Sequence, residues 1–187
     1  IGITIHAGET PTYNQGLSGN KAIEEALNMG ADRIGHSVQA VTDPNTLDRL
    51  RESGATVEIC GVCNISSIPL NTRGMAIHPI QEFIRRDIPI TICTDNDAIC
   101  GTNITKEYAQ FLLTGHSELM NWNTVKEVAR NGVETAFISE KDKAEALRIF
   151  KKRIRIIERM MVEEKTRSTK ETDQKKIEEL RSSIAQK

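Results

Sequence analysis

Four titratable side chains could do chemistry together, because each follows a predicted strand. They are His6 and Glu9 after the first strand, His36 after the second and Asp95 after the fourth. Zn²⁺ accepts imidazole nitrogen and carboxylate oxygen as ligands, and it lowers the pKa of a bound water towards about 7. A nearby glutamate can then shuttle a proton, and a second histidine can hold or deprotonate the water. These residue types indicate metal-assisted hydrolysis, without naming a substrate.

Each of these residues, taken alone, has a simpler interpretation. A single histidine after a strand is more often a hydrogen-bonded structural residue than a metal ligand. An aspartate between a strand and a loop is usually a helix cap or a turn former. Cys60 and Cys63 have the C-x-x-C spacing of a redox or zinc pair, but no second pair is nearby, so we expect structural or incidental cysteines. Tyr13 carries no positional argument and is assigned to the surface or the core.

The elements that must position these side chains alternate between strand and helix. Short apolar, β-branched runs predict strands near residues 1–5, 32–35, 55–60 and 88–93. Helical spacing and end signals predict helices over 20–29, 44–53, 78–87, 103–113, 123–131 and from about 139 onward. The stretch after the third strand, rich in Asn, Ser and Pro as far as Gly74, is expected to be a loop.

Strands that recur with helices between them are typical of parallel βα units. Reactive side chains at the carboxyl ends of the strands converge at one mouth in a (β/α)8 TIM barrel. We therefore expect an α/β fold in which four units make half of such a barrel. An open half would leave two edge strands and an uncovered core face.

Composition excludes several other classes of protein. The 187 residues are 27% charged, with a formal net charge of −1, which argues against a general binder of nucleic acid or of anionic membranes. No apolar run approaches the roughly 20 residues that span a bilayer. Four cysteines are too few for a disulfide scaffold in a chain of this length, so we expect a cytoplasmic protein.

The chain is expected to have two parts. Residues 1–138 would form the barrel half, and residues 139–187 would form a helical extension that is solvated or frayed after about residue 165. Residues 151–187 carry an excess of Lys and Arg, whereas the preceding part has an excess of Asp and Glu. The chain also begins at Ile1 within a predicted strand, so we expect further sequence upstream or in a separate chain.

Several short motifs together resemble adenosine deaminases. They are His6-Ala7-Gly8-Glu9 after an isoleucine-rich strand, Arg33-Ile34-Gly35-His36, Glu58-Ile59-Cys60 with Asn64, and Thr94-Asp95-Asn96. Their order and spacing match the family from about residue 1 to residue 150. The resemblance covers the second half of the family's barrel, from its fifth strand to its eighth, plus the terminal helices.

The resemblance implies a role for each catalytic and metal-binding residue. His6 and Asp95 would ligate Zn²⁺. Glu9 would protonate N1 of a purine, so that C6 becomes electrophilic. His36 would orient the attacking water and help to deprotonate it. The implied reaction is the hydrolytic deamination of adenosine or deoxyadenosine to the inosine product and ammonia.

Substrate binding is implied for Gly8 and Asn96. The family commonly has a second aspartate that bonds purine N7 at the position of Asn96, and an amide can donate to N7 directly. The family's usual Cys-Pro-x-Ser-Asn loop is Cys60-Gly61-Val62-Cys63-Asn64 in this sequence. These departures leave two alternatives open: a deaminase of adenine or another adenine-bearing metabolite, and a non-catalytic barrel half that mediates association.

The family's metal-binding His-x-His pair is missing from this sequence. His6 and Asp95 alone would give zinc two protein ligands, where a catalytic site needs at least three. We therefore expect the partners to be a small-molecule purine nucleoside and the N-terminal half of the barrel, as upstream sequence or as a separate chain. Nucleic acid and membranes are not expected partners. This chain alone should neither bind zinc tightly nor deaminate a substrate.

Overall fold

The computed structural model describes residues 1–13, 16–67, 78–113 and 119–185. By packing, the chain divides into two compact units, Ile1–Lys143 and Ala144–Lys187. The first unit contains a sheet and the helices around it. The second consists of the larger part of one long helix, α8 (Glu140–Ala185). The predicted division after residue 138 stays a prediction.

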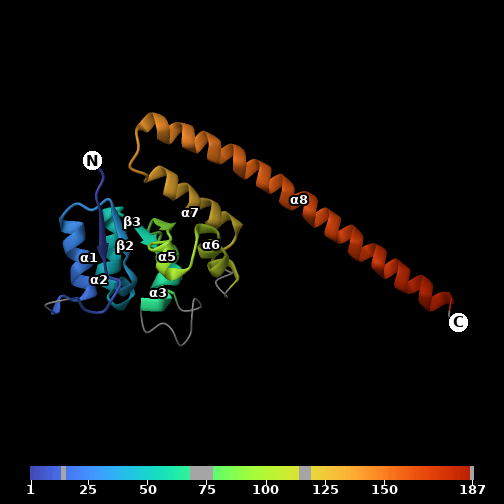
Figure 1. Cartoon of the computed structure of the whole chain (residues 1–187), viewed down its shortest axis with the longest axis horizontal. Helices are drawn as coiled ribbons and strands as arrows, with labels where there is room; N and C mark the ends of the chain where they lie inside the picture. The colour runs from blue at the N-terminus through green and yellow to red at the C-terminus, as the bar shows by residue number, and fades with distance from the viewer. Residues whose placement is uncertain (14–15, 68–77, 114–118, 186–187) are drawn as a thin grey trace. The chain divides into compact units, whose positions relative to one another are not determined.

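Four short strands form one parallel sheet whose spatial order is the order of the sequence (Figure 1). They are β1 (Thr4–Ala7), β2 (Arg33–His36), β3 (Thr56–Ile59) and β4 (Ile90–Ile92). His6 pairs with Gly35, Gly35 with Glu58, and Glu58 with Thr91, so these residues form one row across the sheet. Parallel neighbours need a crossover connection, and helices provide it here.

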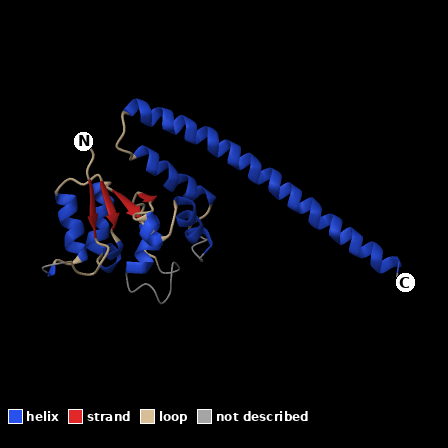
Figure 2. Cartoon of the chain, viewed as in Figure 1, coloured by secondary structure: helices blue, strands red, loops and turns tan. Residues whose placement is uncertain are grey.

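The crossover helices agree closely with the predicted ones. The connections contain α1 (Gly19–Asn28), α2 (Pro44–Ser53) and α4 (Ile80–Arg85), and α6 (Ile104–Leu113), α7 (Trp122–Glu134) and α8 follow the last strand (Figure 2). Capping signals explain the starts of the first two. The Ser18 side chain accepts a hydrogen bond from the Lys21 N–H, and the Asp43 side chain accepts one from the Asn45 N–H.

Three short helices were not predicted. They are the 3₁₀ helix η2 (Val38–Thr42), α3 (Gly61–Ser67) and α5 (Asp97–Cys100). The expectation of a loop after the third strand is therefore wrong for residues 61–67, and its continuation through 68–77 lies outside the described residues. Each of these helices begins within a few residues of the carboxyl end of a strand. The predicted functional residues follow the same strand ends, so the three helices lie near them.

The sheet has one apolar face and one polar face. Ile34, Val57, Ile59 and Ile90 alternate into the buried core together with residues of the covering helices, such as Phe83. The other face carries the intervening residues, including His6, Arg33 and Glu58. Arg33 Nε donates to Glu58 Oε1 at 2.6 Å on that face. Since helices pack on one face only of a barrel's sheet, this polar face corresponds to a barrel interior.

No helix within the described ranges combines the length and the apolar character that a membrane span requires.

Candidate active site

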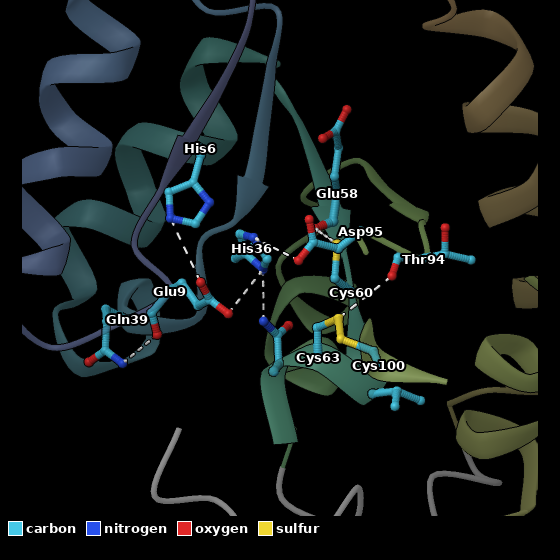
Figure 3. A network of polar contacts seen from close by, with 12 residues as sticks. His6, Glu9, His36, Gln39, Glu58, Cys60, Cys63, Thr94, Asp95 and Cys100 are labelled. Carbon is cyan, nitrogen blue, oxygen red and sulfur yellow. Dashed lines mark hydrogen bonds and ion pairs between the residues drawn. A yellow bond between two sulfur atoms is a disulfide. The ribbon is translucent and has the colours of Figure 1, made fainter. Parts of the chain in front are cut away.

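Glu9 lies in the turn after β1, and its backbone is fixed by hydrogen bonds. Its N–H donates to the Tyr13 hydroxyl at 2.9 Å, and its carbonyl accepts from Gln39 Nε2 at 3.3 Å. The Gln39 N–H also donates to the Gly8 carbonyl at 2.8 Å. Gly8 has a φ of +73°, a left-handed conformation that makes the sharp turn possible. Together these contacts aim the Glu9 carboxylate at the carboxyl ends of the strands (Figure 3).

His36 ends β2 and is buried, with 2% of its surface exposed. Its Nδ1 lies 3.8 Å from Glu9 Oε1, and its Nε2 lies 4.0 Å from Asp95 Oδ2 (Figure 3). The φ of His36 is +72°, which turns the chain away from the strand at this residue. Burial lowers the pKa of the His36 imidazole, and the nearby Glu9 carboxylate offsets part of that effect. The ring is therefore disposed to be neutral at pH 7.

His6 completes a compact group of possible metal ligands. His6, Glu9 and His36 each offer one ligand atom, and these atoms lie within 4.8 Å of one another. His6 Nε2 is 3.7 Å from Glu9 Oε2, and the two histidine rings have centroids 4.7 Å apart. Two imidazoles and a carboxylate suit Zn²⁺, so the donor set fits the metal that the sequence predicts.

Asp95 approaches this group from the loop after β4, and its side chain is 45% exposed. It is not one of the three residues whose ligand atoms group within 4.8 Å. Its neighbour Asn96 caps α5, and the Asn96 carboxamide oxygen accepts from the Ile99 N–H at 3.3 Å. The Asn96 oxygen is thus used as the helix cap, whereas its NH₂ group is available to donate to a ligand. The assigned roles of His6, Gly8, Glu9, His36, Asp95 and Asn96 stay predictions, although the fold gathers their chain segments at one edge.

The four cysteines do not behave as one set. Cys63 forms a disulfide with Cys100, which joins α3 to the end of α5 (Figure 3). This bond was not predicted from the sequence, because its partners are 37 residues apart and belong to two unpredicted helices. Cys60 and Cys93 are free thiols. Burial raises the pKa of the Cys60 thiol, and it raises the pKa of Cys93 to about 11, so both thiols stay protonated and unreactive at neutral pH.

Several residues that support the site were not identified from the sequence. Tyr13 and Gln39 hold the Glu9 backbone, as described above. Asn64, known from the sequence only as part of a motif, has its Nδ2 2.8 Å from His36 Nδ1, and its Oδ1 is 3.1 Å from His78 Nε2. His78 was noted only as the start of a helix. Glu9 and Tyr13 lie four residues apart in one loop, whereas the other contacts join separate segments that no local sequence signal connects.

Comparisons with known proteins agree with this fold and this arrangement. A family model described as adenosine deaminase matches residues 1–152. An adenosine deaminase of Photorhabdus laumondii is 36% identical over 148 residues, which are 79% of this chain and 40% of that relative. The chain therefore spans about two fifths of the length of the curated relatives it matches.

Solved structures share the fold. The adenine deaminase from Arthrobacter aurescens superposes with a TM-score of 0.70 and 20% identity, over 83% of this chain and 44% of that one. An amidohydrolase from B. ambifaria, solved with bound Zn, has a TM-score of 0.66 and 18% identity, over 83% of this chain and 41% of that one. Both matches cover less than half of the solved chain, which confirms the predicted half of a TIM barrel. By its motifs, its fold and the family model, the chain belongs to the adenosine deaminase family.

Proposed function

We propose that this chain supplies the second half of the active site of a zinc-dependent purine deaminase. The reaction is the hydrolysis of adenosine or deoxyadenosine to the inosine product and ammonia. The observation that carries the proposal is the grouping of His6, Glu9 and His36 within 4.8 Å at the carboxyl ends of β1 and β2. In a (β/α)8 barrel this end of the strands is where catalytic residues lie.

Zinc would be held by His6 and Asp95 from this chain and by a His-x-His pair from the N-terminal half of the barrel, present as upstream sequence or as a separate chain. We call the assembly of that half with this chain the completed barrel. When bound, Zn²⁺ supplies Lewis-acid charge that lowers the pKa of water towards about 7. Asp95 would also contact the attacking oxygen.

Glu9 would deliver a proton to purine N1, which makes C6 electrophilic enough for water to add. Hydrogen bonds to Tyr13 and Gln39 fix the Glu9 backbone, from which the side chain of a general acid must reach N1. His36 would orient the water that adds to C6. The proton that water loses as its oxygen adds to C6 would pass through a carboxylate to the amino group, which leaves as ammonia. The C6 hydroxyl would return its proton to Glu9 as it becomes the carbonyl of the product.

Gly8 and Asn96 would contact the purine. Purine N7 is a hydrogen-bond acceptor, and Asn96 has an NH₂ donor to offer, since its oxygen caps α5. Asn96 is thus suited to N7 although the family commonly has an aspartate there. Gly8 would contribute its backbone, since a Cβ at this position would face Ile23 in the core.

Adenine or another adenine-bearing metabolite is the second candidate substrate. The adenine deaminase that superposes on this chain makes this alternative specific. A panel of adenosine, deoxyadenosine, adenine and adenosine monophosphate, followed by loss of the 6-amino chromophore in the completed barrel, separates the two. The highest kcat/KM for adenine would overturn the assignment of a nucleoside.

A third hypothesis, a non-catalytic barrel half, predicts no turnover of any substrate and substoichiometric zinc. We further propose a cytoplasmic location, where the reducing environment would keep Cys63 and Cys100 as thiols.

Replacement of Glu9 by glutamine tests the proposed chemistry. A glutamine side chain cannot deliver a proton to N1, so we expect Glu9→Gln to lower kcat by about 10²- to 10⁴-fold in the completed barrel. Zinc content, measured by elemental analysis, should stay at the level of the unmodified protein. Glu52→Gln, an exposed change on α2, serves as the matched control and should leave kcat unchanged. A Glu9→Gln variant with near-normal kcat would contradict the assignment.

A further inference from the structure

A buried chain of hydrogen bonds connects the start of α4 to His36. The Ile80 N–H donates to His78 Nδ1 at 3.2 Å, His78 Nε2 lies 3.1 Å from Asn64 Oδ1, and Asn64 Nδ2 lies 2.8 Å from His36 Nδ1. His78, Asn64 and His36 are 2%, 0% and 2% exposed, so water does not compete for these contacts. The residues come from three separate segments of the chain.

The direction of every bond in this chain follows from its first member. A backbone N–H can only donate, so His78 Nδ1 must accept and cannot carry a proton. An imidazole ring carries a proton on at least one nitrogen, so the proton of His78 is on Nε2. His78 Nε2 then donates to Asn64, which must present its oxygen at that end. The Asn64 NH₂ group is consequently at the other end, where it donates to His36 Nδ1.

We propose that Asn64 and His78 are positioning residues that set the tautomer of His36, with Nδ1 as an acceptor and the ring proton on Nε2. His36 Nε2 is the nitrogen that faces Asp95, at 4.0 Å from Oδ2. The proton of His36 therefore lies on the side of the ring where a predicted zinc ligand lies.

This tautomer changes the role of His36 in the reaction, a consequence that rests on the proposed function. With Nδ1 occupied by Asn64 and a proton on Nε2, the neutral ring has no lone pair with which to take a proton from water. His36 instead donates a hydrogen bond to the attacking oxygen. The proton that water loses as its oxygen adds to C6 goes to a carboxylate, Glu9 or Asp95.

Long-range ¹H–¹⁵N NMR of the ¹⁵N-labelled 187-residue chain tests the tautomer directly, since a protonated and an unprotonated ring nitrogen have well-separated shifts. Spectra are recorded at a pH where the ring is neutral, and the His36 signals are assigned with a His36→Gln variant. We expect Nε2 to be protonated and Nδ1 to be unprotonated. A proton on Nδ1 in the unmodified chain overturns the proposal, whatever the fate of any variant.

Asn64→Asp tests the cause of the tautomer. An ionised carboxylate accepts only, so it still serves His78 Nε2 but now requires a donor at His36 Nδ1. We expect the His36 proton to move to Nδ1 in Asn64→Asp. Asn131→Asp is the matched control. Asn131 lies on α7, and its Nδ2 donates to the Ile90 carbonyl of β4 at 3.1 Å rather than to His36. An unmoved proton in a folded Asn64→Asp chain, or a proton moved equally in the control, contradicts the proposal.

His78→Gln and His78→Leu separate positioning from packing. A glutamine amide can still donate to Asn64, whereas leucine cannot, so glutamine should preserve the single tautomer and leucine should yield a mixture. In the completed barrel we expect Asn64→Asp to lower kcat by at least about 100-fold with little change in KM, as a wrong histidine tautomer does elsewhere. An inactive unmodified barrel would refute the proposed function but not the tautomer, which the NMR spectrum reports independently.

Discussion

Gly8 controls the geometry of the site at the scale of a single residue. Its φ of +73° places it in the left-handed region, and its buried Cα faces the core helix α1. A Cβ built on Gly8 would clash with Ile23 Cδ1 and would lie 3.2 Å from the Ser37 Cα. Any side chain at this position therefore has to displace Ile23 as well as adopt an unfavourable backbone conformation. Both effects would shift the adjoining Glu9.

We expect Gly8→Ala to destabilise the chain for these two reasons. The left-handed conformation costs a non-glycine residue about 1–2 kcal/mol, and overpacking against Ile23 adds about 1–3 kcal/mol. Gly30→Ala is the matched control, because Gly30 has a φ of +79° with nothing within 4 Å of a built Cβ. Urea unfolding of both variants measures the difference. Equal losses of the free energy of unfolding would show that the contact with Ile23 is unimportant.

Residue types allowed part of the site to be predicted. His6, Glu9, His36 and Asp95 were found from the sequence because each follows a strand, and parallel strands bring their carboxyl ends to one edge. Their supporting residues were not found, because a tyrosine or an asparagine acquires its function only from what folding places beside it. The hydrogen bond between Asn64 and His36 joins residues 28 apart, and no periodicity marks either one.

At the scale of elements, α3 depends on a side chain from a different helix. Glu107 of α6 is fully buried, and its carboxylate accepts from the Val62 N–H at 3.2 Å and from the Thr102 hydroxyl at 2.8 Å. The Val62 N–H belongs to the first turn of α3, where backbone donors have no partner within the helix. α3 was missed in the sequence for this reason, since the residue that caps it lies 45 positions away.

Burial raises the pKa of the Glu107 carboxyl, which makes the stability of the chain depend on pH. When the pKa of a carboxyl is higher in the folded state than in the unfolded state, its contribution to the free energy of unfolding is fully present below the unfolded pKa. That contribution is lost as the pH rises through the folded pKa. Glutamine resembles the protonated acid and does not titrate. We therefore expect the free energy of unfolding of Glu107→Gln, relative to the unmodified chain, to increase as the pH rises above 4.5, the ordinary pKa of a glutamate carboxyl.

Urea unfolding at several pH values checks this trend, and Asp43→Asn supplies a control of opposite sign. The hydrogen bond from the Thr46 hydroxyl lowers the pKa of the Asp43 carboxyl, so its contribution is present above the unfolded pKa and is lost as the pH falls. Glu107→Ala should cost about 1–3 kcal/mol, because it removes the carboxylate that accepts from the Val62 N–H and the Thr102 hydroxyl. A pH-independent difference between Glu107→Gln and the unmodified chain would contradict the expected titration.

At the scale of the whole molecule, the sheet ends where a barrel would continue. β1 and β4 are its edge strands, each paired on one side only among the described residues. The polar face that carries His6, Arg33 and Glu58 is the face a closed barrel would enclose. The parallel order of the strands was predicted from the alternation of strand and helix. The helix α8 was predicted from about residue 139 onward, but its later apolar residues are too sparse to indicate packing, so the sequence did not indicate that it would be continuous to Ala185.

The division of the ligands between two barrel halves makes a prediction about zinc. This chain offers His6 and Asp95, and its sequence has no His-x-His. We expect the 187-residue chain to bind Zn²⁺ at least about 100-fold more weakly than the completed barrel, because the loss of even an outer partner of a zinc ligand costs 10- to 100-fold. Competition with a chromogenic chelator measures both affinities.

Two substitutions in the completed barrel assign the ligands that this chain contributes. Asp95→Asn should weaken zinc binding, whereas Asp48→Asn, which removes an exposed carboxylate paired with Arg86 on the helical side of the sheet, should not. His6→Ala should weaken binding in both the isolated chain and the completed barrel. If the isolated chain bound Zn²⁺ as tightly as the completed barrel, the prediction would be wrong. The third ligand would then come from this chain, where the geometry offers Glu9 or His36 beside His6.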